Sequence, residues 1–320
     1  MPSDTLRTQK KYKKESQIMP VKTIGMVGIG QLGLPIATNL LAAGFNVVGF
    51  RRSDREAFVA LGGVALDSPA QVAARADFII TCLPSEAAHT HIMEGPDGLL
   101  QSIGPRHTLV EIGTYTKTFK QHMAGRIEAC GAQALEAEVS GTPSMVLQRK
   151  ASLFLGGDPA VVERCQPVLT AIADMQFHIG ELGCAVAMKL IANYLLTIHT
   201  LAAAEALNLG ARAGFDAQQV VEVIRQSAGG STMFSIRGPM MASRSFEPAP
   251  GPFLTLEKYL DLAAGMSAEL GCASPLFDAA KPYFERAIAQ GIGDQDISAV
   301  ITLIEADSTP HSNKRKDHAY

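Results

Sequence analysis

A lysine and an asparagine four residues apart interrupt an otherwise apolar stretch. Lys189 and Asn193 lie within residues 180–214, where Ala, Leu, Met and Ile dominate and no proline occurs. Side chains four apart on a helix project from one face. An ammonium group can stabilise and protonate an alkoxide, and the neutral amine can take a hydroxyl proton. The pair therefore indicates acid–base chemistry. The alternative is a lysine that merely extends into solvent from an apolar surface.

The segment that carries this pair is predicted to be one long helix. Glycines mark its two ends, and only Gly210 lies within it. Over residues 184–211 it would be roughly 42 Å long at about 1.5 Å per residue. Such a length suits an element that two domains share.

A glycine-rich turn near the N-terminus indicates dinucleotide binding. VKTIGMV, from Val21, predicts a buried strand that leads into Gly28-Ile29-Gly30-Gln31-Leu32-Gly33, and a helical pattern and a second strand at 46–50 follow. Gly28 permits the tight turn, Gly30 lets the backbone approach a pyrophosphate, and Gly33 lets the helix pack close to the strand. In this context the motif predicts the cofactor turn of a Rossmann domain. A purely structural glycine turn is the alternative.

The residues after the second strand favour NADP as the cofactor. NAD-specific sites place Asp or Glu here to accept hydrogen bonds from the ribose, whereas this chain has Arg51, Arg52 and Ser53. Two guanidinium groups and a hydroxyl suit a 2′-phosphate. Asp54 comes one residue late and is predicted to cap the next helix. An exposed basic loop is the alternative, and NAD remains possible.

Three further strands are predicted to end at one edge of the sheet. They span 77–83, 108–113 and 133–139, and they lead into Leu83-Pro84-Ser85, Gly113-Thr114 and Ser140-Gly141-Thr142-Pro143. Ligands of open parallel sheets bind beyond the carboxyl ends of the strands. Each of these residue types is common in any turn, but their shared position predicts one crevice. Strands at 152–155 and 176–179 complete the sheet.

The pattern changes after Gly214 to helices without strands, at about 216–226, 256–270 and 275–290. The predicted fold class is α/β: an N-terminal Rossmann domain with a mostly parallel, doubly wound sheet, joined by the long helix to an all-α C-terminal domain. The predicted divisions are a disordered extension at 1–20, the NADP-binding domain at 21–182, a helical domain for substrate and oligomerisation at 183–308, and a tail at 309–320.

Composition limits the partners and the compartment. The 320 residues carry a net charge of −3 with both signs interspersed, so no nucleic-acid or membrane partner is predicted. The five scattered cysteines indicate reduced thiols in a cytoplasmic protein, and the eight histidines form no spaced ligand set, so no metal is predicted. The apolar helical half predicts a homodimer or homotetramer.

Together, in this order and spacing, the motifs resemble the β-hydroxyacid dehydrogenase family, which includes 3-hydroxyisobutyrate dehydrogenase and tartronate semialdehyde reductase. The resemblance spans residues 21–304 and rests on the glycine turn, Leu83-Pro84, Val139-Ser140-Gly141, Gly183 with Lys189 and Asn193, and Gly230-Ser231-Thr232. It implies NAD(P)-linked interconversion of a short β-hydroxyacid and its semialdehyde or keto acid. Lys189 would be the catalytic acid/base, with Asn193 orienting the substrate. Implied cofactor contacts are Leu83, Pro84, Thr114 and Lys258, and implied substrate contacts are Ser140, Gly141, Thr142 and Ser231.

This chain departs from the family pattern at four places. The family's Asp-Ala-Pro-Val-Ser-Gly-Gly is here Glu136-Ala137-Glu138-Val139-Ser140-Gly141-Thr142, its Asp-x-Ser-Thr is Glu111-Ile112-Gly113-Thr114, its Gly-Thr is Arg149-Lys150, and Tyr259 replaces an aspartate after Lys258. Glu138 and Thr142 change charge and backbone freedom near the substrate's acid group. We therefore expect the family fold, with a larger or differently charged substrate as one possibility.

Three functions compete at this stage. The first is an NADP-preferring reductase of a small aldehyde or keto acid. The second is an imine-reductase-like enzyme on the same scaffold, which the lysine at position 189 disfavours because those enzymes typically lack it. The third is a non-catalytic dinucleotide-binding redox sensor, against which the intact Lys189–Asn193 pair argues. Single-turnover hydride transfer would separate the sensor from the two enzymes.

Overall fold

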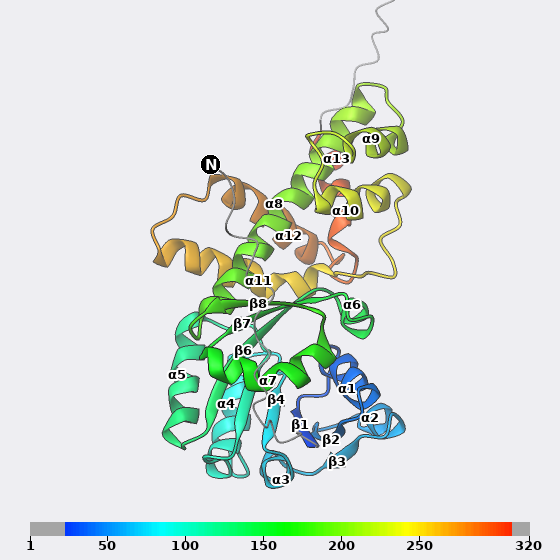
Figure 1. The fold of residues 1–320 in the computed structure, drawn as a ribbon. Helices are drawn as coiled ribbons and strands as arrows, with labels where there is room; N and C mark the ends of the chain where they lie inside the picture. The colour runs from blue at the N-terminus through cyan, green and yellow to red at the C-terminus, as the bar shows by residue number, and fades with distance from the viewer. Residues whose placement is uncertain (1–22, 309–320) are drawn as a thin grey trace, which may run out of the picture.

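The computed structural model describes residues 23–308, so the predicted extension at 1–20 and the tail at 309–320 lie outside the described residues. A sheet domain and a helical domain follow one another along the chain and lie one above the other in Figure 1. The long helix α8 (Cys184–Arg212) joins them. The exact domain division at 182/183 stays a prediction.

The sheet has eight strands in the order β3-β2-β1-β4-β5-β6-β7-β8. Their bounds are β1 (Thr23–Val27), β2 (Asn46–Phe50), β3 (Val64–Leu66), β4 (Phe78–Thr81), β5 (Thr108–Glu111), β6 (Gln133–Ser140), β7 (Ser152–Gly156) and β8 (Met175–Gly180). Among these described strands only β6 and β7 pair antiparallel, with Val139 opposite Leu153. The sheet grows from β1 in both directions, which confirms the predicted mostly parallel, doubly wound fold. It also places the ligand crevice at the carboxyl ends of the strands.

Helices cover both faces of the sheet because its central strands are apolar on both sides. One face packs on α1 (Gly33–Ala42), α6 (Pro143–Leu147) and α7 (Pro159–Ile172), and the other on α3 (Pro69–Arg75), α4 (Glu86–Glu94) and α5 (Lys117–Ala129). The short elements α2 (Glu56–Ala60) and η1 (Leu99–Gln101) lie in the connections. Each face therefore has its own apolar core.

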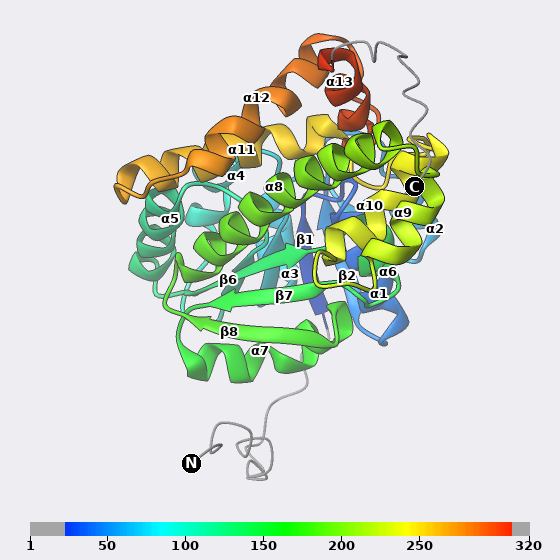
Figure 2. The same ribbon diagram turned by 90° about the horizontal axis from the view of Figure 1, so that it is seen from above.

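The helical domain packs around α8. Its other elements are α9 (Ala217–Ile224), α10 (Thr232–Ser243), α11 (Phe253–Glu269), α12 (Pro275–Ala289), η2 (Ile297–Ala299) and α13 (Val300–Asp307). From above, α8 crosses the sheet with α10 on one side and α11 and α12 on the other (Figure 2). Helix α10 was not predicted, because Gly238 and Pro239 interrupt its pattern. Packing against α8 overrides their poor helix propensity.

Helix α8 is long and apolar enough, by length and composition alone, to cross a membrane. Of its most apolar 18-residue window, 44% is buried inside the structure. Helices α10 to α13 supply that cover. A buried core helix meets the same two criteria, and α8 occupies such a position in the helical domain.

Candidate active site

The glycine turn has the geometry that its predicted role requires. Gly28 has φ +99°, and a Cβ there would lie 2.1 Å from the carbonyl oxygen of Cys82. A Cβ on Gly33 would lie 2.1 Å from the carbonyl oxygen of Gly28, whereas one on Gly30 would meet nothing within 4 Å. The side chain of Ile29 is in the core, Gln31 is exposed, and no side chain caps α1 after Leu32. The turn thus leaves space and backbone donors for a phosphate.

After β2, Arg52 and Ser53 are exposed and Arg51 is partly exposed, but Asp54 does not cap a helix as predicted. It has φ 53°, and its carboxylate accepts from the Arg51 guanidinium at 3.3 Å and the Ser53 hydroxyl at 3.1 Å. Helix α2 begins after Arg55 without a side-chain cap. The capping prediction was wrong because the left-handed backbone at Asp54 turns its carboxylate back to Arg51. Among the described residues, Arg52 has no hydrogen-bond or ion-pair partner.

Two lysines from different helices reach the carboxyl ends of the strands. Lys189 on α8 donates from Nζ to the carbonyl oxygen of Val139, at the end of β6, over 2.7 Å. Lys258 on α11 donates from Nζ to the carbonyl oxygen of Pro84, after β4, over 3.4 Å. Their Nζ atoms lie 5.5 and 5.2 Å from the ring centroid of Tyr259. The helical domain therefore brings two cations to carbonyl groups at the strand ends of the sheet domain.

Lys189 and Asn193 are both buried, with 7% and 8% of their surfaces exposed. The Nδ2 group of Asn193 has no hydrogen-bond partner within the described residues. Burial lowers the pKa of Lys189, the nearby Glu138 raises it, and Lys258 lowers it further. A buried amide with an unused donor beside a lysine of lowered pKa is the arrangement expected of a site that binds and protonates a ligand.

The predicted substrate residues fall into two groups. Ser140 ends β6 directly after the Val139 carbonyl that binds Lys189, and Gly141 follows with φ +148°. The hydroxyl of Thr142 accepts from the N–H of Met145 and caps α6. Ser231 is different, because its hydrogen bonds tie it to its own helix α10. Its substrate contact stays a prediction.

Two of the departures from the family pattern have local packing roles. A Cβ at Gly113 would lie 2.1 Å from the Tyr115 hydroxyl, which donates to the carbonyl oxygen of Leu83 over 2.9 Å. Tyr115 thus fills the space of a side chain at position 113. Arg149 has φ 59° and donates to Thr170 and Asp174, at the end of α7. These two departures from the family pattern therefore have local structural explanations that do not involve the substrate.

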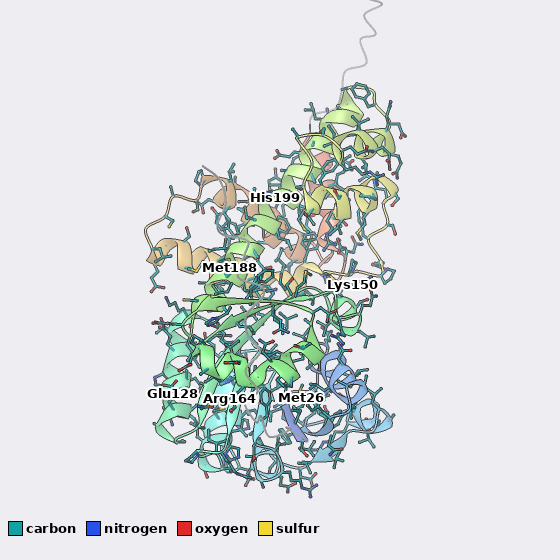
Figure 3. All side chains as sticks on the ribbon, in the orientation of Figure 1. Met26, Glu128, Lys150, Arg164, Met188 and His199 are labelled. Atoms are coloured by element: carbon teal, nitrogen blue, oxygen red, sulfur yellow. The ribbon has the colours of Figure 1, made fainter. Side chains whose placement is uncertain are left out.

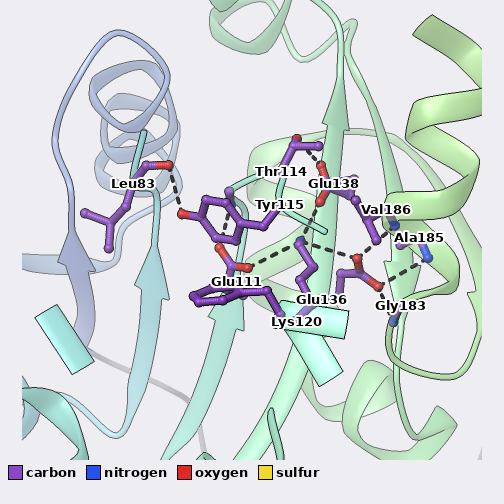
Figure 4. Close-up of polar contacts among 12 residues, drawn as sticks. Leu83, Glu111, Thr114, Tyr115, Lys120, Glu136, Glu138, Gly183, Ala185 and Val186 are labelled. Carbon is purple, nitrogen blue, oxygen red and sulfur yellow. Dashed lines mark hydrogen bonds and ion pairs between the residues drawn. The ribbon is translucent and has the colours of Figure 1, made fainter. Parts of the chain in front are cut away.

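A buried cluster of charges below the crevice was not anticipated (Figure 4). The Nζ atom of Lys120, on α5, lies 2.5 Å from Glu138 and 3.3 Å from both Glu111 and Glu136. Lys120 shares the buried helix face of Met123, Ala124 and Ile127. A lysine at this spacing on an apolar face is the sequence signal from which the buried charge cluster could have been predicted. Among the described residues no group of His, Cys, Asp or Glu forms a metal site.

Glu136 attaches the start of α8 to the sheet. Its Oε2 accepts from the N–H groups of Gly183 at 2.9 Å and Ala185 at 3.2 Å, and its Oε1 accepts from Val186 at 2.8 Å. A carboxylate from β6 therefore satisfies three donors of the helix N-terminus, where the helix dipole favours negative charge. Lys189 follows Val186 by three residues, so the same bonds fix its height above the strand ends.

Burial governs protonation in the charge cluster. It raises the pKa of Glu111 to about 8, although Lys120 opposes the shift. Burial also raises the pKa of Glu138, again against the effect of Lys120. Burial lowers the pKa of Lys120, but the three carboxylates outweigh this and leave it above its usual range. Glu111 and Glu138 therefore both keep their protons to a higher pH than exposed carboxyl groups do, while Lys120 stays charged.

Comparison with known proteins finds two family models that together match most of the chain. Residues 23–180 match the family model for the NAD-binding domain of 6-phosphogluconate dehydrogenase, and residues 183–304 match the NAD-binding model of NADP-dependent 3-hydroxyisobutyrate dehydrogenase. The 2-(hydroxymethyl)glutarate dehydrogenase of Eubacterium barkeri is 32% identical over 88% of this chain and 94% of its own length. The chloroplastic glyoxylate/succinic semialdehyde reductase 2 of Arabidopsis thaliana is 30% identical over 89% of this chain and 80% of its own.

A solved structure shares the whole architecture. The 3-hydroxyisobutyrate dehydrogenase of Mycobacterium tuberculosis with L-serine superposes with a TM-score of 0.82 at 27% identity, over 89% of this chain and 99% of that one. The fold and these likenesses define an NAD(P)-dependent oxidoreductase that acts on hydroxyl groups. The chain belongs to the β-hydroxyacid dehydrogenase family.

Proposed function

We propose that the protein is an NADP-preferring reductase that interconverts a small β-hydroxyacid and its semialdehyde or keto acid. The observation that carries this proposal is the pair of buried donors on α8. The Lys189 ammonium lies at the end of β6, where it donates to Val139. The Asn193 Nδ2 group, which has no partner among the described residues, lies one turn further along the same face of α8. They supply what a carbonyl oxygen needs when it becomes an alcohol: stabilisation of negative charge, a proton and a fixed orientation.

The residues divide the work as follows. The cofactor, when bound, supplies the hydride in reduction and takes it up in oxidation. One N–H of Lys189 is held by the carbonyl of Val139, so two remain for the substrate oxygen and for proton transfer. Asn193 Nδ2 donates to the same end of the substrate. Ser140 and Gly141 bind the substrate's carboxylate from the end of β6.

The chain fits a nicotinamide dinucleotide at the other side of the crevice. The open space at Gly30 and the uncapped start of α1 suit the pyrophosphate. Leu83, Pro84 and Thr114, which follow β4 and β5, are the residues we assign to the cofactor between the glycine turn and Lys189. Lys258 reaches the same strand ends through its bond to Pro84. Of the residues after β2, Arg52 has no partner within residues 23–308, so we assign it to the 2′-phosphate.

Replacing Arg52 by alanine should weaken NADPH binding about tenfold and NADH binding much less. A charge-assisted hydrogen bond to phosphate has about this magnitude, and NADH has no 2′-phosphate to lose. Calorimetric titration of both cofactors measures the two dissociation constants. Arg126→Ala, which removes an exposed arginine paired with Glu94, is the control. Equal losses for the two cofactors would contradict the assignment.

The substrate class comes from the family and the site together. The relatives named above act on hydroxy acids or semialdehydes by their names, which supports a small acid for this chain. The lysine at position 189 disfavours the imine-reductase alternative. NADPH oxidation with a panel of tartronate, methylmalonate and succinic semialdehydes and glyoxylate, with a cyclic imine in parallel, tests the class. Turnover of the imine alone would refute the proposal.

We also propose that the protein is a homodimer or homotetramer. Met188, Ile191 and Leu195 follow one another along α8 at helical spacing and are exposed. Figure 3 shows Met188 on α8 just above the sheet domain. An apolar stripe of this kind is typical of surfaces that a second copy covers. Sedimentation of the purified protein would show a single monomer-sized species if the proposal is wrong.

A further inference from the structure

Two lysine ammonium groups lie against the same aromatic ring. The Nζ atoms of Lys189 and Lys258 are 5.5 and 5.2 Å from the ring centroid of Tyr259. Both distances are within the range, up to about 6 Å, in which an aromatic face attracts a cation. Within residues 23–308 the hydrogen bonds of both lysines go to carbonyl oxygens, and neither lysine forms an ion pair. The ring of Tyr259 is therefore a contact that the two cations share.

Tyr259 lies between the two lysines along the edge of the sheet. Lys258 reaches the chain just after β4, and Lys189 reaches the end of β6. Strand β5 lies between β4 and β6 in the sheet. The Tyr259 hydroxyl is within hydrogen-bonding reach of the side chain of Thr114, which follows β5. Three side chains of the helical domain thus meet three consecutive strand ends, with the aromatic ring in the middle.

Helix α11 fixes the position of this ring. Leu256 and Ala263, three residues before Tyr259 and four after it, are buried and share its helix face. Tyr259 itself is partly buried and packs against the apolar core of the helical domain. The ring therefore belongs to a rigid element, whereas the lysine side chains on either side of it are long and intrinsically flexible.

The phenol adds no charge of its own to the crevice. Burial and the nearby Glu138 raise the pKa of Tyr259 to about 12, although a hydrogen bond with Thr114 opposes the rise. Tyr259 is thus neutral at physiological pH. The aspartate that the family pattern has at this position would add a negative charge, whereas the tyrosine attracts cations through its ring alone.

We propose that Tyr259 is a positioning residue for the reaction: its ring holds the Lys189 ammonium at the end of β6 and keeps it apart from the ammonium of Lys258. This inference rests on the proposed function of Lys189 in carbonyl reduction. Two like charges repel one another strongly where little water screens them. With the ring between them, Lys189 keeps its bond to Val139 and presents its other N–H groups to the substrate oxygen. The ring acts through Lys189 and needs no contact with the substrate.

The test changes the electrons of the ring while its shape stays almost constant. Tyr259→Phe removes only the hydroxyl. Phenylalanine derivatives with an increasing number of ring fluorine atoms at the same position then weaken the negative face stepwise, because fluorine withdraws electrons from it. Tyr259→Leu removes the ring altogether. A dependence on fluorine reports the attraction between ring and cation, which a merely structural role of Tyr259 would not show.

The readout is the pKa of Lys189, measured without substrate. In protein labelled with ¹³C at the lysine ε-carbons, NMR titration follows the signal that is missing from Lys189→Arg. Charged and titratable groups face Lys189 from β6 (Glu138) and from α11 (Lys258 and Tyr259), and fluorination alters only the ring. We expect Tyr259→Phe to leave the pKa of Lys189 within about 0.3 unit of the wild type, and the most fluorinated ring to lower it by about one unit.

The matched control is the same series at Tyr283 on α12, whose ring centroid lies 4.8 Å from the Arg286 guanidinium rather than beside a crevice lysine. It should leave the pKa of Lys189 unchanged. A pKa that does not respond to fluorine at position 259 would overturn the proposal. An effect of Tyr259→Phe as large as that of Tyr259→Leu would also overturn it, since the hydroxyl rather than the ring would then be responsible.

Activity provides the second readout. Along the fluorinated series kcat for reduction should fall about three- to tenfold, the size of one weakened cation–π contact, while the KM of the substrate changes less. If the wild type reduces no substrate, the proposed function fails, while the NMR series still decides whether Tyr259 holds Lys189. If reduction occurs and neither kcat nor the NMR signal responds to fluorine, the proposed function stands and the role of Tyr259 is refuted.

Discussion

Lys189→Ala is expected to lower kcat/KM for the reduction of the preferred substrate by about 10²- to 10⁴-fold, the usual range for a positioned general acid. The variant loses both the proton donor and the charge that stabilises the product oxygen. NADPH binding should change little, because the contacts assigned to the pyrophosphate and 2′-phosphate lie at the other end of the crevice. Steady-state kinetics and cofactor titration of the same preparation measure the two effects.

Lys281→Ala is the control for this experiment, since it removes a lysine of α12 that pairs with Asp261 and Glu285 outside the crevice. It should retain wild-type kcat/KM. Undiminished turnover in Lys189→Ala would remove Lys189 from the mechanism. A loss confined to KM, with kcat intact, would reassign it to substrate binding.

Glu136→Ala is expected to destabilise the protein by about 4 kcal/mol. The variant leaves three N–H groups at the start of α8 without their acceptor, and it removes one partner of a buried ion pair with Lys120. Each loss alone is worth at least 1 kcal/mol by ordinary experience with buried donors and broken pairs. Urea unfolding followed by far-UV circular dichroism measures the change in midpoint and slope.

Glu128→Ala is the matched control, because an exposed glutamate away from special features should change stability by no more than about 0.5 kcal/mol. The bonds from Glu136 to the start of α8 also fix the position of Lys189. The Glu136→Ala protein that remains folded should therefore have a lowered kcat. A variant as stable as the wild type would mean that water replaces the carboxylate at the helix start.

The fold could be predicted from local patterns because its main elements obey them. Apolar runs of strand length, the glycine turn and the proline-free stretch around Lys189 gave the sheet, the cofactor turn and α8. Gly28 and Gly33 have backbone surroundings that admit no side chain, so their spacing carries structural information by itself. Lys189 and Asn193 share a helix face by spacing alone.

The features that were missed depend on contacts between segments far apart in the sequence. Glu136 and Glu138 alternate with Ala137 and Val139, a pattern that ordinarily indicates one solvated face of a strand. Both glutamates are buried instead, because α5 provides Lys120 and α8 provides backbone donors. No local pattern shows that such partners will arrive. Asp54 likewise has the position of a cap, and only its left-handed backbone directs it to Arg51.

The most direct test of the central claim is to follow the hydride itself. The wild-type protein is incubated in single-turnover amounts with NADPH that carries deuterium at the transferring position of C4, together with each semialdehyde or keto acid of the panel. The products are examined by NMR. We predict one deuterium on the new carbinol carbon of a small hydroxy acid, and its near absence with Lys189→Ala. Tight NADPH binding without deuterium transfer to any of these acids would contradict the account.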